Sequence, residues 1–84
     1  MKKTIVSTTT ISYSVPDNGD VTLTIYNAKG QLVNSLVNEY KNKGNYQVIW
    51  NGKDINGNSV ASGLYITRLV SGGETVKNKM LLMK

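Results

Sequence analysis

The residues that could carry chemistry are few in this chain. It contains five carboxylates, Asp17, Asp20, Glu39, Asp54 and Glu74, and it has no histidine and no cysteine. The usual general base and the usual soft metal ligands are therefore missing. A serine nucleophile would lack a base, and the stretch around Ser62, Val60-Ala61-Ser62-Gly63, matches neither G-x-S-x-G nor S-x-x-K. We expect a protein that is not an enzyme and that uses no cofactor.

The segment Asp54-Ile55-Asn56-Gly57-Asn58 has the composition of a calcium loop but not its spacing. A calcium loop of the helix–loop–helix type needs glycine at its sixth position and glutamate at its twelfth. Here glycine is fourth, and Tyr65 is twelfth. We predict a turn held by hydrogen bonds from backbone N–H groups to the Asp54 side chain, with no metal bound. Asp17 and Asp20 flank Asn18-Gly19 and are likewise interpreted as turn residues.

The aromatic and basic residues allow two further readings. The formal net charge is +5, but Arg68 is the single arginine, so we expect no nucleic acid partner. Trp50, Tyr26, Tyr40 and Tyr46 could form a platform for sugars. Trp50 is in phase with Tyr46 and Val48, which favours a core position, and Tyr26 and Tyr40 are the better candidates for exposure.

The hydrophobic pattern has a period of two along most of the chain, which predicts strands. The expected strands are 10–15, 21–26, 31–37, 46–51, 64–70 and 75–83, with Thr4-Ile5-Val6 as a further strand at an edge. Residues 38–45 are expected to cross between sheets as a loop, a bulge is expected in 31–37, and Gly72-Gly73 is expected to form a tight turn. Two packed sheets would bury Val21, Leu23, Ile25, Tyr46, Val48, Trp50, Tyr65 and Leu69. The chain length predicts one domain over 1–84, with 1–7 as a linker or an edge strand.

Several motifs resemble a known family. They are Thr9-Thr10-Ile11-Ser12-Tyr13-Ser14-Val15-Pro16, Gly44 to Asp54, Asn56-Gly57, Val60-Ala61-Ser62-Gly63-Leu64-Tyr65, and Lys77 to Lys84. The pattern is similar to the immunoglobulin-like domain of the flagellar hook-cap protein. It is closer to the type A C-terminal sorting domains of the type IX secretion system of Bacteroidota. The resemblance implies an all-β fold, an immunoglobulin-like antiparallel β-sandwich of about seven strands.

The resemblance to sorting domains also implies a function. Such a domain directs a fused cargo protein through the outer-membrane translocon, and a sortase-like peptidase can then attach the cargo to the cell surface. The chain would be secreted or surface-bound by way of the periplasm, and the cargo is absent from this sequence. Gly63, Tyr65, Lys79 and Lys84 occupy signature positions by resemblance. Together with Lys77 they are the expected residues of translocon recognition.

Two other functions stay open. Residues 3–7 hold Lys-Thr-Ile-Val-Ser, where sorting domains carry an asparagine- and proline-rich motif. The chain could instead be a structural immunoglobulin-like spacer or assembly module of a surface or flagellar protein, or a carbohydrate-binding module of a secreted hydrolase. No apolar run reaches the ~20 residues of a membrane helix, so we expect no transmembrane segment.

Overall fold

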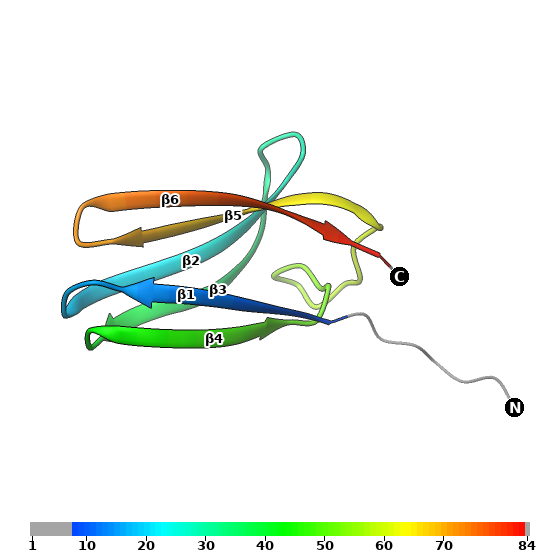
Figure 1. Ribbon diagram of the computed structural model, residues 1–84. Coiled ribbons are helices and arrows are strands. Elements are labelled where there is room, and N and C mark those ends of the chain that lie inside the picture. The colour runs from blue at the N-terminus through cyan, green and yellow to red at the C-terminus, as the bar shows by residue number, and fades with distance from the viewer. Residues whose placement is uncertain (1–7, 84) are drawn as a thin grey trace, which may run out of the picture.

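The computed structural model describes residues 8–83 and shows six strands, with no helix among those residues. The strands are β1 (Thr9–Val15), β2 (Gly19–Asn27), β3 (Leu32–Lys41), β4 (Gly44–Trp50), β5 (Gly63–Ser71) and β6 (Glu74–Leu82) (Figure 1). Each expected strand is therefore present. The further strand expected at Thr4-Ile5-Val6 lies outside the described residues.

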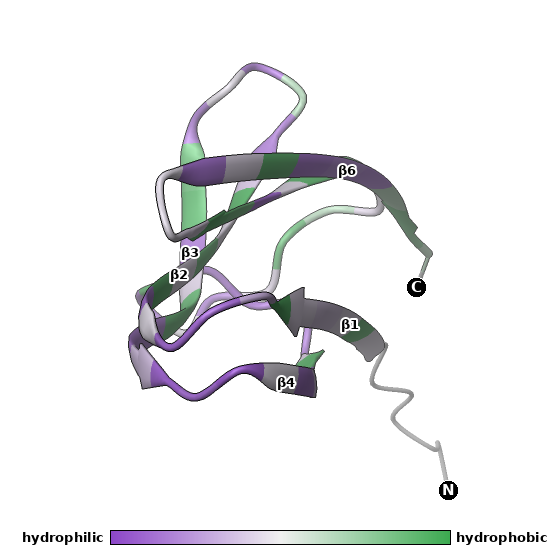
Figure 2. Ribbon diagram, turned by 60° about the vertical axis from the view of Figure 1, so that its left-hand side comes forward, coloured by the Kyte–Doolittle hydropathy of each residue, from purple (hydrophilic) through white to green (hydrophobic). Residues whose placement is uncertain are grey.

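The strands form two antiparallel sheets of unequal width. One sheet pairs β1 with β4, and the other has the order β3-β2-β5-β6. Figure 2 shows β1 and β4 as a layer of their own beside the larger sheet. This arrangement confirms the predicted antiparallel β-sandwich. No helix in the described part of the chain is long and apolar enough to cross a membrane.

The hairpin turns follow the chemistry expected of their residues. Between β5 and β6, Gly72 and Gly73 have φ values of 57° and 81°. A two-residue hairpin turn of this kind needs positive φ at both central positions, which glycine adopts without strain. Between β2 and β3, the Asn27 carboxamide oxygen accepts hydrogen bonds from the N–H groups of Lys29 and Gln31. Gly30 there has a φ of 83°.

Strand β3 differs from its expected course. Its pairing with β2 skips Leu36 and Val33, because Leu23 faces Val37 while Thr24 faces Ser35, and Ile25 faces Asn34 while Tyr26 faces Leu32. These two bulges confirm the predicted irregularity. The prediction of a loop over 38–45 is wrong, because residues 38–41 still pair with β2 and only residues 42 and 43 connect β3 to β4. An edge strand has one free side, so polar residues can extend it without burial.

The core consists of two adjoining clusters between the sheets. One contains Tyr13, Val15, Val21, Leu23 and Val37, and the other contains Ile25, Val33, Trp50, Tyr65 and Leu82. Five of the predicted core residues are therefore buried. Tyr46, Val48 and Leu69 were expected in the core but are only partly buried against the first cluster. The cause is the small width of the β1–β4 sheet. Each of its two strands has an open side, next to which Tyr46 and Val48 stay partly exposed, and the sheet leaves Leu69 of the wider sheet partly uncovered.

Trp50 lies at the end of β4 and is completely buried. Its indole N–H donates a hydrogen bond of 3.0 Å to the Lys53 carbonyl. Its ring meets the Tyr65 ring edge to face, with 5.1 Å between centroids and an angle of 68°. The Tyr65 hydroxyl in turn donates to the Ala61 carbonyl over 2.6 Å. Trp50 therefore joins the small sheet, the larger sheet and the 51–62 loop.

We predict that Trp50→Ala lowers the free energy of unfolding by about 3 to 5 kcal/mol, because it removes a buried aromatic ring and leaves a cavity. Urea unfolding followed by circular dichroism measures this loss. Ile49→Ala is the matched control, because Ile49 is the preceding residue of β4 and is 64% exposed. Equal stability of the two variants would contradict the central place of Trp50.

Candidate functional site

The Asp54 segment is a turn, as predicted. One carboxylate oxygen of Asp54 accepts hydrogen bonds of 2.9 Å from the N–H groups of both Asn56 and Asn58. The Asp54 N–H donates to the Asn58 carbonyl, and the Gly57 N–H donates to the Asp54 carbonyl. Backbone N–H groups therefore use Oδ1 of this carboxylate as their hydrogen-bond acceptor. Within residues 8–83, no cluster of three or more acidic, histidine or cysteine side chains is placed to hold a metal ion.

The residues expected to mediate recognition are split between two faces of the larger sheet. Tyr65 points inward and is 6% exposed, so its side chain belongs to the core. Gly63 begins β5 and pairs with Leu82. Lys77 and Lys79 point outward from β6 and are exposed. Lys84 lies outside the described residues. The structure thus brings the two lysines together but separates them from Tyr65.

Strand register places the outward-facing residues of the larger sheet in rows across the strands. One row runs from Ser35 through Thr24 and Arg68 to Lys77. The next row runs from Leu32 through Tyr26 and Ile66 to Lys79. We call this surface, made of Leu32, Tyr26, Ile66, Arg68, Lys77 and Lys79, the outer face. Arg68 and Tyr26 could not be predicted as neighbours of the lysines from the sequence, because their proximity depends on strand pairing.

A shallow pocket of about 280 Å³ lies on the outer face, lined by Tyr26, Gly30, Ile66, Arg68 and Lys77. A hydrogen bond with Thr24 is the largest cause that lowers the pKa of the Tyr26 phenol, and a hydrogen bond with Arg68 is the second. The positive charges of Arg68 and Lys77 contribute to the lower pKa. The pocket therefore holds two cations, Arg68 and Lys77, beside the phenol.

A second, larger groove of about 700 Å³ opens between the two sheets. Its lining includes Ile11 and Tyr13 of β1 and Leu69, Val76 and Asn78 of β5 and β6. Val76 is 48% exposed although it faces the other sheet. The groove exists because β1 is the edge of a sheet with only two strands.

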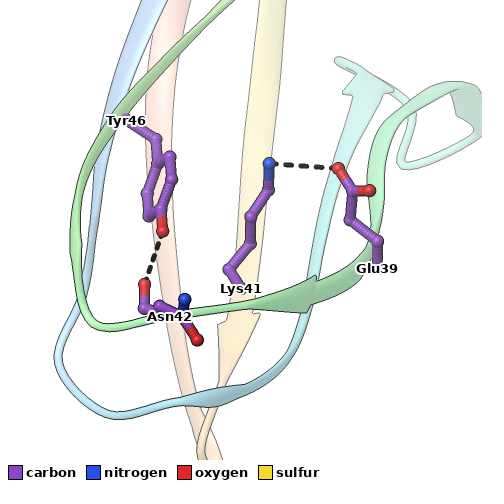
Figure 3. A network of polar contacts seen from close by, with 4 residues as sticks. All are labelled: Glu39, Lys41, Asn42 and Tyr46. Carbon is purple, nitrogen blue, oxygen red and sulfur yellow. Dashed lines mark hydrogen bonds and ion pairs between the residues drawn. The ribbon is translucent and has the colours of Figure 1, made fainter.

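The turn between β3 and β4 carries a polar network (Figure 3). The Tyr46 hydroxyl donates to the Asn42 carbonyl over 2.6 Å, and the Lys41 ammonium lies 3.0 Å from a Glu39 carboxylate oxygen. The same ammonium lies 4.9 Å from the centre of the Tyr46 ring, and the Glu39 hydrogen bond raises the pKa of Lys41. Tyr46 also stacks on Tyr13, with 5.5 Å between centroids. These contacts close one end of the sandwich.

The candidate sugar platform is not assembled. Trp50 is buried, and Tyr46 stacks on Tyr13 of the neighbouring strand, on the inner side of the β1–β4 sheet. Tyr26 and Tyr40 both point outward, but Tyr40 pairs with Asp20 near the start of β2 and Tyr26 lies near its end. Six residues of strand separate the two positions along β2, which is about 20 Å. The carbohydrate-binding interpretation therefore has no aromatic surface to support it.

We predict that Asp54→Ala lowers the free energy of unfolding by about 1 to 2 kcal/mol, because two backbone N–H groups lose their acceptor. Asp54→Asn keeps an acceptor oxygen and should cost less. The melting temperatures of the unchanged protein and the two variants are measured by thermal unfolding, each in EDTA and in calcium. A melting temperature that rises by several degrees with calcium would contradict a purely structural turn.

We predict that Tyr26 ionises at a lower pH than an unstructured tyrosine. The lowered pKa gives stability that is fully present above the pKa of the unfolded chain and is lost as the pH falls through the folded pKa. Titration of the carbon-13-labelled Tyr26 ring by NMR measures the midpoint. Thr24→Val and Arg68→Gln should both raise it, with the larger effect from Thr24. Unchanged midpoints would show that these side chains do not act on the phenol.

Comparison with known proteins gives this architecture a family. Residues 3–77 match the family model described as the FlgD Ig-like domain. Among the solved structures that match is FlgD from P. aeruginosa, with a TM-score of 0.71 and 28% sequence identity over 89% of this chain. The match covers 60% of that FlgD chain, so this chain spans less than two thirds of its length. A search of curated proteins found no match. The predicted similarity to the hook-cap immunoglobulin-like domain is thereby confirmed, and the chain belongs to the FlgD Ig-like domain family.

Proposed function

We propose that the chain is a non-catalytic immunoglobulin-like assembly module of a larger surface or flagellar protein. The observation that carries this proposal is the match to the FlgD Ig-like domain family over residues 3–77. The alignment with 60% of the FlgD chain supports a role as one part of a larger protein. The sorting role, to which the sequence motifs pointed first, has no counterpart in these matches.

The path of the chain through the sandwich favours an assembly module over an in-line spacer. The first residues of β1 and the last residues of β6 lie at the same end of the sandwich (Figure 1). Near this end, Leu82 of β6 shares a core cluster with Trp50, which pairs with Thr9 of β1. A spacer in a linear array is expected to receive and release the chain at opposite ends. Here the far end, with three turns, projects away from any flanking segments.

One observation keeps the sorting domain as a second candidate. Strand β6 forms an outer edge of the larger sheet, so one side of its backbone can pair with another strand. Lys77 and Lys79 project from the same strand. Under this second proposal, the type IX translocon would bind β6, a sortase-like peptidase would process the protein, and the cargo would reach the cell surface by way of the periplasm.

We predict that the protein that carries this chain no longer assembles into its surface or flagellar structure in the natural host when residues 8–83 are deleted. The loss should persist when an unrelated immunoglobulin-like sandwich with both chain ends on one side replaces them, because a specific surface is required. Electron microscopy of the surface structure and recovery of the complex from cells measure assembly. Normal assembly with the unrelated sandwich would reduce the module to a spacer.

A second experiment tests whether the chain acts as a sorting domain. A reporter with an inner-membrane export signal is fused before this chain and expressed in a host with the type IX system. Export of the reporter, and its loss when residues 79–84 are removed, would replace the assembly proposal with the sorting proposal. A known sorting domain on the same reporter is the positive control, and retention of our fusion in the periplasm supports the assembly module.

A further inference from the structure

The outer face combines positive charges that the rest of the molecule leaves uncompensated. Arg68 and Lys77 lie directly opposite each other on β5 and β6. Like charges at such positions destabilise a sheet, because their side chains start only about 5 Å apart. Lys79 follows two residues along β6, about 7 Å from Lys77. Within residues 8–83, the ion pair that forms is that of Lys41 with Glu39, at the turn between β3 and β4.

The same face carries apolar side chains beside these charges. Leu32, in the row of Tyr26 and Ile66, is 54% exposed, and the cross-strand pair Leu64 and Leu81 is 40% and 63% exposed. If this surface served only to keep the protein in solution, its lysines would suffice and exposed leucines would not be expected beside them. Tyrosine and arginine beside apolar residues are instead typical of protein interfaces. The outward side of the β1–β4 sheet is polar apart from Ile49, and it carries no charged residue in the register of the two strands.

The pocket lies where the charged row and the apolar row meet. Ile66 contributes an apolar wall, and Tyr26, Arg68 and Lys77 contribute polar groups. Its volume of about 280 Å³ is at the lower limit of small-molecule sites, and it is large enough for one inserted side chain. Arg68 and Lys77 place two positive charges in its lining, where a carboxylate side chain would be attracted.

We propose that the outer face, at Tyr26, Arg68, Lys77 and Lys79, docks a protein segment whose paired carboxylates stand beside aliphatic side chains. This proposal deepens the assembly function and rests on it, because it names the surface and the partner chemistry. On a helix, glutamates four residues apart lie about 5 to 6 Å from each other, which matches the spacing from Arg68 to Lys77. Leucines on the adjacent helix positions would cover Leu32 and Ile66.

Other anionic partners fit the outer face less well. Nucleic acid binding depends on many phosphate contacts, and this surface offers three cations. It also has a single aromatic ring, Tyr26, on which a base could stack. A membrane surface would attract the cations, but the leucines are fixed on a rigid sheet and cannot insert as the apolar face of a helix does. A protein segment uses both the charges and the leucines.

The test uses a helical peptide of about 16 residues with glutamates at i and i+4 and leucines at i+3 and i+7, and a second peptide with glutamine in place of glutamate. NMR titration of the folded chain should show the glutamate peptide shifting the amides of Tyr26, Ile66, Arg68, Lys77 and Lys79. The glutamine peptide should bind at least about tenfold more weakly. Equal binding of the two peptides, or shifts confined to the groove between the sheets, would overturn the proposal.

Charge-reversed variants locate the binding surface. Arg68→Glu and Lys77→Glu should each raise the Kd of the glutamate peptide at least about tenfold. Lys43→Glu is the matched control, because it makes the same change of net charge at the exposed turn between β3 and β4. An equal loss in the control would mean that net charge alone binds the peptide, which contradicts the proposal. Arg68→Gln and Lys77→Gln, with melting temperatures measured, provide the same test if a reversal disturbs folding.

Two further probes distinguish the partner classes. Phosphatidylcholine vesicles containing phosphatidylglycerol and a single-stranded oligonucleotide are titrated in the same buffer. If either binds at the outer face while the glutamate peptide does not, the partner is a lipid surface or a nucleic acid and the proposal fails. If nothing binds the isolated chain but the domain replacement still abolishes assembly, the surface is wrong while the assembly function stands.

Discussion

Burial of Trp50 is the contact on which the sandwich depends. A sheet of two strands has little surface with which to hold a sheet of four, and within residues 8–83 this indole ring is the largest fully buried side chain. It packs on Tyr65, while its N–H binds the carbonyl of Lys53 in the loop that follows β4. The loop is held a second time by Asn34, whose amide donates to the same carbonyl. The Trp50 contacts therefore set both the separation of the sheets and the path of the chain from β4 to β5.

The unequal widths of the two sheets explain the rest of the surface. Because β1 and β4 cover only part of the larger sheet, Val76 and Leu69 face a groove instead of a packed layer. The opposite side of the larger sheet has no covering layer in the described structure. Its charges and leucines are thus displayed on a rigid platform of four strands. A platform of this kind suits binding, because its side chains are already fixed by strand pairing before a partner arrives.

Alternating side chains encode which face each strand buries, so the strands and the buried Val21, Leu23 and Ile25 could be predicted from sequence. The length of β3 could not, because polar residues such as Asn38 and Glu39 extend an edge strand as readily as they form a loop. The partial exposure of Tyr46, Val48 and Leu69 depends on the small width of the β1–β4 sheet, which no local pattern records. Tyr26 of β2 and Lys77 of β6 line the same pocket because β5 pairs with both strands. This strand order could not be predicted from the local sequence pattern.

The outer face and the sequence motifs report different things. The motifs that carry the family resemblance include Trp50 and Tyr65, and both residues are buried in the core. Buried residues report the fold and say little about a partner. Arg68, Lys77 and Lys79 are exposed and contribute nothing to the core, and Arg68 opposes Lys77 at a cost in stability. A repulsive pair on an outward sheet face, with Arg68 on an inner strand and Lys77 on the edge strand β6, is better explained by a partner that neutralises it than by folding. The outward rows of the larger sheet are therefore where we propose that this chain binds its partner.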